Sequence, residues 1–256
     1  MLLRISLILS VPFTIFACAS AGLRAPRPDV PATLCPDEPG GATAQECALR
    51  RNAYIAKSIG STVRVQLISY TPRDGMGGGL GTGVVIDERG TVLTAYHVVK
   101  DAEFVLVIPR QAQIGDDSQL RMVDLPPIPM VVTKASPEKD VALLVAKHDV
   151  GVIAPPMGLG RGYVPSVGER LWHFGQTTVG ARGPITDLSV ATLGFTGLVA
   201  AQMKSAEGDS GGPVVAPDGT LVGTVIANNE SKGLTYFRPI DDSLNALGLG
   251  EAASDR

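Results

Sequence analysis

The stretch Glu207-Gly208-Asp209-Ser210-Gly211-Gly212-Pro213 places one hydroxyl group among small residues. Its glycines carry no Cβ, so a ligand can approach the backbone closely and a tight turn costs little. Backbone N–H groups beside a serine in such a turn are suited to binding a developing oxyanion. The stretch therefore indicates a loop that presents a nucleophile. The alternative is a glycine-rich turn that only connects two strands.

The hydroxyl of Ser210 needs a base, because a free serine is a weak nucleophile that requires a histidine oriented by a third group. The chain contains His97, His148 and His173, and all three precede Ser210. Residues 208–212 also fit the G-x-S-x-G nucleophile elbow of α/β-hydrolases, but in that fold the histidine follows the serine. The elbow is therefore excluded, and the order that remains is His, Asp, Ser.

His97 lies at the end of a predicted strand. His148 lies in a polar stretch and is assigned to the surface, and His173 is assigned to packing inside the fold. Asp140 is the best orienting acid, since the apolar run after it predicts a buried strand and a buried carboxylate can fix an imidazole tautomer. A solvated aspartate is the alternative reading. Spacing alone does not exclude four aspartates in more polar contexts: Asp101, Asp116, Asp117 and Asp124.

The composition favours short strands. The chain of 256 residues contains 30 Gly and 19 Pro, and its net charge of −3 gives no basic footprint for nucleic acid. Apolar or alternating runs recur every 8–12 residues or so, as in a sandwich or barrel. The predicted strands are 62–68, 81–87, 91–94, 103–108, 130–133, 139–145, 170–175, 187–195, 197–203, 214–215 and 220–226. Residues 75–79 and 111–119 are predicted loops, and 46–58 and 241–247 are predicted short helices.

Residues 1–21 are predicted to be a signal peptide. One positive charge precedes a short apolar run, and Ala19-Ser20-Ala21 fits an A-x-A cleavage site. Ile15-Phe16-Ala17-Cys18 also resembles a bacterial lipoprotein signal, in which Cys18 becomes lipidated and anchors the protein to a membrane. Simple secretion and an uncleaved anchor are the alternatives. The predicted location is the bacterial cell envelope, in the periplasm or on a membrane, or outside the cell.

Two further cysteines, Cys35 and Cys47, lie in a Pro- and Gly-rich linker predicted over residues 22–52. In an oxidising compartment this pair predicts a disulfide. Such a bond would close a short loop and stabilise the fold by about 3 kcal/mol in the chain-entropy view. Two free thiols are the alternative.

Three segments together resemble the motifs of trypsin-like (chymotrypsin-fold) serine proteases: Thr94-Ala95-Tyr96-His97-Val98-Val99, Asp140-Val141-Ala142-Leu143-Leu144 and Gly208-Asp209-Ser210-Gly211-Gly212-Pro213. The wider context resembles the bacterial HtrA/Deg branch without a PDZ domain. The resemblance implies an all-β, chymotrypsin-like double β-barrel with short terminal helices. The protease domain would span residues 53–247, followed by a tail of residues 248–256.

The resemblance also implies the roles of individual residues. Ser210 is the expected nucleophile, His97 the base and Asp140 its orienting acid, with an oxyanion hole formed by the N–H groups of Gly208 and Ser210. Lys204 falls near the base of the primary substrate pocket, where it would favour an acidic side chain, or else it points into solvent. The strand expected to pair with the substrate backbone holds Ile226, Ala227 and Asn228. No metal-ligand spacing is present, and no cofactor is predicted.

Asp209 departs from the Asn that is common in HtrA proteins. In animal trypsin relatives this aspartate pairs with a new N-terminus, but no Ile-Val-Gly-Gly start occurs here, so its partner stays open. The expected function is a serine endopeptidase that hydrolyses protein or peptide substrates through an acyl-enzyme. The alternative is a catalytically latent or non-catalytic peptide-binding protein on the same fold.

Overall fold

The computed structural model describes residues 57–71, 75–114 and 120–250. Several sequence predictions lie outside these ranges: the signal peptide, the lipidation site Cys18, the linker of residues 22–52, the Cys35–Cys47 disulfide and most of the helix at 46–58. In the ranges described, no helix combines the length and the apolar character needed to cross a membrane.

The first half of the described chain forms one antiparallel sheet. Its strands are β1 (Thr62–Thr71), β2 (Gly75–Val85), β3 (Val92–Thr94), β4 (Phe104–Ile114), β5 (Leu120–Asp124), β6 (Ile128–Ser136) and β7 (Val141–Ala146). They are ordered β1-β2-β3-β7-β6-β4-β5, and β1 also pairs with β4. This extra pairing closes the sheet, so that β1, β2, β3, β7, β6 and β4 form the first barrel.

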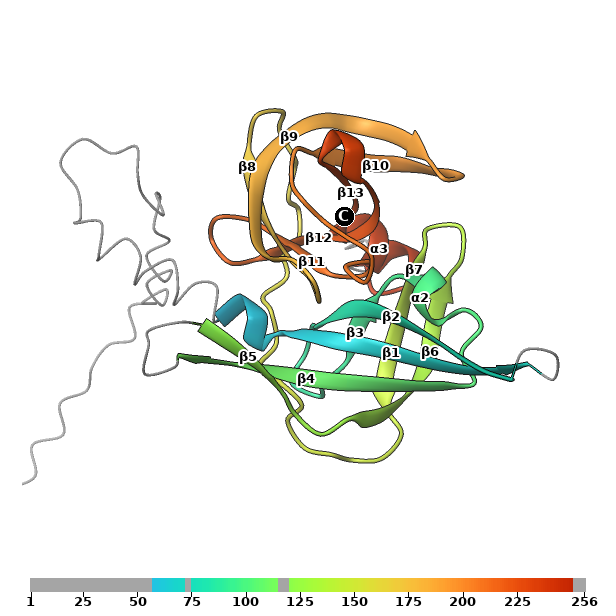
Figure 1. Cartoon of the computed structure of the whole chain (residues 1–256). Coiled ribbons are helices and arrows are strands. Elements are labelled where there is room, and N and C mark those ends of the chain that lie inside the picture. Colours follow the sequence, from blue (N-terminus) through green and yellow to red (C-terminus); the bar gives the residue numbers. More distant parts are fainter. Residues whose placement is uncertain (1–56, 72–74, 115–119, 251–256) are drawn as a thin grey trace, which may run out of the picture.

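The second half forms a closed barrel with the order β10-β13-β12-β11-β8-β9. Its strands are β8 (Arg170–Phe174), β9 (Val179–Thr192), β10 (Phe195–Ala201), β11 (Pro213–Val215), β12 (Leu221–Asn229) and β13 (Leu234–Pro239). Short helices include residues 57–60 before β1, α2 (Tyr96–Val99) after β3, the 3-10 helix Glu230–Lys232 and α3 (Ile240–Ala246) near the end of the described chain. Figure 1 shows the second barrel stacked on the first. The predicted all-β double barrel with a short terminal helix is confirmed.

The core consists of three apolar clusters: one fills each barrel, and one lies between the barrels. One fills the first barrel and includes Val63, Val65, Val92, Val107 and Leu144. Another fills the second barrel and includes Leu171, Ile185, Val199, Val214 and Phe237. The third joins side chains of both barrels, among them Val84, Leu93, Leu143, Trp172, Phe174 and Leu244. Burying such a side chain stabilises a fold by about 1.5–3 kcal/mol, so the third cluster fixes one barrel against the other.

Strand β8 contributes to two of these clusters. Leu171 lies in the core of the second barrel, whereas Trp172 and Phe174 lie between the barrels with their rings 6.3 Å apart. Successive side chains of a strand point to opposite faces. His173 therefore points to the same side as Leu171, and it is completely buried. This agrees with the expectation that His173 packs inside the fold.

The strand predictions differ from the structure in several places. The predicted loop 75–79 is the first half of β2, where it pairs with residues 67–71 of β1. A Cβ on Gly79 would lie 2.7 Å from Leu67, so glycine lets the two strands approach. The predicted loop 111–119 is shorter, because β4 continues to Ile114 and pairs with β5. Strands β5 and β13 were not predicted at all, and β9 begins at Val179 rather than at the predicted residue 187. In each case the strand next to it along the chain supplies hydrogen bonds, as the two arms of a hairpin do.

Candidate active site

Three candidate residues come from three separate elements that meet between the barrels. His97 lies in α2, directly after β3, and Asp140 immediately precedes β7. Strands β3 and β7 are antiparallel neighbours with Thr94 opposite Ala142, which brings the end of one beside the start of the other. Ser210 lies on the loop between β10 and β11 of the second barrel. The first cluster contains Val98 and Val99 of α2 together with Leu198 and Ile226 of the second barrel, so it extends across the two barrels beside His97.

Asp140 holds His97 firmly. Its Oδ2 lies 2.6 Å from Nδ1 of His97, and its Oδ1 accepts the backbone N–H of the same residue at 2.8 Å. The carboxylate is buried, whereas the His97 side chain is 38% exposed. When Nδ1–H donates to the carboxylate, Nε2 keeps its lone pair and can accept a proton. Asp140 has a φ of 55°, a left-handed conformation in which aspartate is one of the better tolerated residues.

The serine loop packs directly against the chain that leads to His97. A Cβ on Gly211 would collide with Thr82 O, Thr94 Oγ1 and Ala95 N, so only glycine fits there. The backbone N–H of Thr82 donates to Ser210 O at 2.8 Å. Within the described ranges the Ser210 hydroxyl makes no hydrogen bond to His97; such bonds are often long in sites without substrate.

The turn at residues 208–210 leaves two backbone donors available. Gly208 has a φ of 90°, and its carbonyl accepts the hydroxyl of Thr82 at 2.7 Å. The N–H of Asp209 donates to Ala206 O at 3.1 Å. Among the described residues, the N–H groups of Gly208 and Ser210 have no acceptor. They are therefore free to bind an oxygen that gains negative charge beside the Ser210 hydroxyl.

The Asp209 carboxylate holds this turn in place through contacts with residues outside it. Its Oδ1 accepts the N–H of Thr177 at 2.9 Å, the hydroxyl of Thr177 at 2.7 Å and the N–H of Thr178 at 3.3 Å. Its Oδ2 accepts the N–H of Ala206 at 2.9 Å and lies 3.4 Å from Nε2 of His173. Burial alone raises the pKa of this carboxyl, but the contacts with His173, Thr178 and Thr177 bring it well below its usual range. The partner that the sequence left open is thus this cluster.

The expected substrate strand has one open edge. Strand β12 pairs with β13 along most of its length, but β11 pairs with it only as far as Thr224. In the part of the chain described, no strand covers the other edge of residues 226–229. Ile226 and Ala227 are buried, and the amide of Asn228 donates to Ser205 O at 2.8 Å. Strand β12 is thus tied to the segment that leads into the serine loop.

Lys204 has an exposed side chain on the same segment. Beside it lies a buried pair of hydroxyls: Ser205 Oγ is 2.8 Å from Thr235 Oγ1, which also donates to Met203 O. Sequence reasoning missed this pair, as it missed Thr82 and Thr177. No local signal marks these residues, because each meets its partner across a long stretch of chain.

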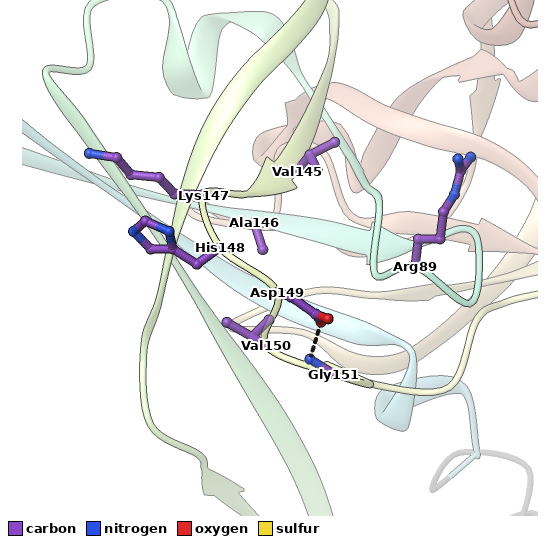
Figure 2. A pocket seen from close by; sticks show the side chains of 8 residues that line it. All are labelled: Arg89, Val145, Ala146, Lys147, His148, Asp149, Val150 and Gly151. Atoms are coloured by element: carbon purple, nitrogen blue, oxygen red, sulfur yellow. Dashed lines mark hydrogen bonds between the residues drawn. The ribbon is translucent and has the colours of Figure 1, made fainter.

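A hollow on the first barrel lies away from these residues (Figure 2). It is lined by Arg89 and residues 145–151, which include the exposed His148. Arg89 precedes β3 and Lys147 follows β7, so the hollow lies at the end of these strands opposite His97 and Asp140. In this hollow Asp149 accepts the N–H of Gly151 at 3.0 Å. His148 is therefore separate from the candidate site.

A family profile described as "Trypsin-like peptidase domain" matches residues 81–223, which are more than half of the chain and include His97, Asp140 and Ser210. The chain belongs to the trypsin-like peptidase domain family. The resemblance drawn from the three sequence motifs is confirmed, and the double barrel is the architecture which that resemblance implied.

Two plant relatives extend this assignment of the trypsin-like peptidase domain. Protease Do-like 1, chloroplastic, of Arabidopsis thaliana is 25% identical over 178 residues, which are 64% of this chain and 37% of that protein. Putative protease Do-like 14 of the same plant is 28% identical over 176 residues, covering 65% of this chain and 40% of that protein. This chain thus spans less than half the length of either relative.

Proposed function

We propose that this trypsin-like peptidase domain is a serine endopeptidase with His97, Asp140 and Ser210 as its catalytic triad. The observation that carries the proposal is the double contact of Asp140 with His97, beside a serine loop packed against residues 94 and 95. Nucleophile, base and orienting acid are the three groups that acyl transfer by serine requires. Two free N–H groups next to the serine supply the remaining requirement.

The reaction begins when Ser210 Oγ attacks the carbonyl carbon of a peptide bond and its proton passes to Nε2 of His97. The carbonyl oxygen becomes an oxyanion that accepts hydrogen bonds from the N–H groups of Gly208 and Ser210. Asp140 stabilises the imidazolium that has formed. As the intermediate collapses, His97 gives the proton to the leaving amine. Water then attacks the Ser210 ester with His97 again as base, which releases the acid product and restores the serine.

The substrate is a protein or peptide that binds in extended form. Residues 226–228 of β12 offer a strand edge without a partner in the described chain, and an extended peptide can add to such an edge through backbone hydrogen bonds. This would align the scissile bond with Ser210, because Asn228 is bonded to the segment before the serine loop. The exposed Lys204 on that segment would favour an acidic substrate side chain.

The site of action we propose is the bacterial cell envelope, on the strength of the signal-like residues 1–21 and of Cys18. Mass spectrometry of the mature N-terminus distinguishes a lipidated Cys18 from simple cleavage after residue 21. The same measurement under non-reducing conditions tests the proposed Cys35–Cys47 link, which removes two hydrogen masses. An unmodified N-terminus at Met1 would contradict this location.

Fluorophosphonate labelling of the full chain tests the proposed chemistry, because the probe reacts with an activated serine. We expect covalent labelling at Ser210 in the parent protein and none in Ser210→Ala or His97→Ala. His148→Ala is the matched control, since it removes an exposed histidine distant from the site, and it should label like the parent. A folded parent protein that remains unlabelled would contradict the endopeptidase and favour the peptide-binding alternative.

A further inference from the structure

His173 is a buried titratable side chain that the proposed reaction does not use. It lies on β8 opposite Val214 of β11, and its ring reaches the loop that holds the catalytic serine. Nδ1 is 3.2 Å from Pro213 O, and Nε2 is 3.4 Å from Asp209 Oδ2. A Cβ on Gly212 would lie 3.1 Å from the edge of the ring, so the backbone here packs closely around the imidazole.

Both ring nitrogens of His173 face oxygen atoms that can only accept hydrogen bonds. A neutral ring carries one proton, so one of its nitrogens would turn a lone pair toward either the Pro213 carbonyl or the Asp209 carboxylate. Both side chains are completely buried, so water cannot relieve that repulsion. A ring protonated on both nitrogens donates to Pro213 O and turns its second N–H toward the Asp209 carboxylate, with which it forms an ion pair. It also supplies the positive charge that a buried carboxylate requires.

We propose that His173 is a positioning residue that is protonated on both ring nitrogens. Through its ion pair with Asp209 it holds in place the turn at residues 208–210, here called the oxyanion-hole turn. Its effect on catalysis rests on the proposed endopeptidase function. The connection is direct, because Asp209 Oδ2 both faces His173 and accepts the N–H of Ala206. Ala206 O in turn accepts the N–H of Asp209, which lies between the two N–H groups of the oxyanion hole.

Of the charged side chains near His173 in the described chain, that of Asp209 contacts the ring, and the others have different partners. Arg110 of β4 donates to Gly175 O at 3.1 Å, and its charge also interacts with that of Asp209. Arg182 of β9 lies over the Trp172 ring, on the opposite face of β8. Arg238 of β13 donates to Lys139 O and Thr196 O. Strand β11 carries no titratable side chain.

Two substitutions separate the two contacts of the ring. In His173→Gln the side-chain amide replaces the donor toward Asp209, and in His173→Asn it replaces only the donor toward Pro213. We expect acylation by p-nitrophenyl acetate, followed as the pre-steady-state burst at saturation, to slow about 100-fold in His173→Asn, like the loss of one oxyanion donor. His173→Gln should stay within about 10-fold of the parent, and the apparent binding constant should change little in either variant. His148→Gln is the control and should match the parent.

The pH profile gives a readout that packing alone would not change. The pH dependence of acylation should differ between the parent and His173→Gln, because only the parent carries an ionisable side chain at this position, whereas His148→Gln should keep the profile of the parent. Equal acylation rates in both folded variants and the parent, or identical pH profiles of the parent and His173→Gln, would overturn the proposed role.

Ring ¹⁵N NMR of the parent decides the protonation state without activity and without a core substitution. The His173 signals are assigned by their absence in His173→Gln or, if that variant does not fold, by their contact with Pro213. At pH 7 both ring nitrogens of His173 should resonate as protonated nitrogens, and one pyridine-type nitrogen would refute the ion pair. An unlabelled Ser210 with a doubly protonated His173 would instead mean that the ion pair exists and the endopeptidase proposal fails.

Discussion

Asp140 contacts His97 twice, once at the ring nitrogen Nδ1 at 2.6 Å and once at the backbone N–H at 2.8 Å. The two oxygens of one buried carboxylate thus fix both the ring and the start of α2. Because Asp140 itself is held between the loop before it and the buried β7, the orientation of His97 is set by the first barrel. The second barrel supplies Ser210 and its turn, so the site depends on the packing between the two barrels.

Replacing Asp140 by Asn should abolish most of the proposed activity and preserve the fold. Asn has the same size and tolerates the left-handed backbone at φ 55°. Its amide, however, can turn an N–H toward Nδ1 of His97. The neutral ring then carries its proton on Nε2, so Nε2 can no longer accept the proton of the Ser210 hydroxyl. We expect fluorophosphonate labelling to slow by about 10⁴-fold. Asp101→Asn, at an exposed aspartate beside Lys100, is the control, and equal labelling of the two variants would contradict the role of Asp140.

Thr82 connects the first barrel to the oxyanion-hole turn. Its hydroxyl donates to Gly208 O and accepts the N–H of Gln176 at 3.0 Å. In Thr82→Val both groups lose their buried partner, at a cost of about 1–3 kcal/mol for each group left unpaired. We expect a lower melting temperature and slower labelling of Ser210. Thr82→Ser keeps the hydroxyl, so its labelling rate should stay close to that of the parent; no difference between Val and Ser at this position would disprove the connection.

The residues with a chemical signature in the sequence could be identified before the structure. Ser210 stands among glycines, His97 follows a strand, and Asp140 opens an apolar run, so each has a local pattern. Thr82 has none, because it meets Gly208 across 126 positions of the chain. His173 was recognised as buried, but its ion pair depends on how β8 and the serine loop meet. The barrels were predicted from short apolar runs, whereas residues 75–79 form a strand only because β1 supplies their hydrogen bonds.

Gly175 leaves the space that the Asp209 carboxylate occupies. A Cβ at this position would overlap the carboxylate, and the backbone cannot easily move because its N–H donates to Thr178 O and its carbonyl accepts Arg110. Gly175→Ala should therefore destabilise the fold by about 1–3 kcal/mol or more and reduce labelling of Ser210. In Gly158→Ala the nearest atom is 3.9 Å away, so its melting temperature should change little. Similar melting temperatures for both variants would show that the carboxylate can relocate.

Asp209 should make the fold sensitive to acid. Its pKa is lower in the folded chain than its reference value of 3.8, so the unfolded chain binds more protons in this range. The stabilisation is therefore fully present above about pH 4 to 5 and is lost as the pH falls further, toward the pKa of the folded state. Asp209→Asn should be less stable than the parent at pH 7 by about 2–3 kcal/mol. Thermal unfolding between pH 2 and 7 should show the two curves converging in acid, whereas Asp101→Asn should follow the parent throughout. Parallel curves for the parent and Asp209→Asn would mean that the carboxylate is not preferentially ionised in the folded state.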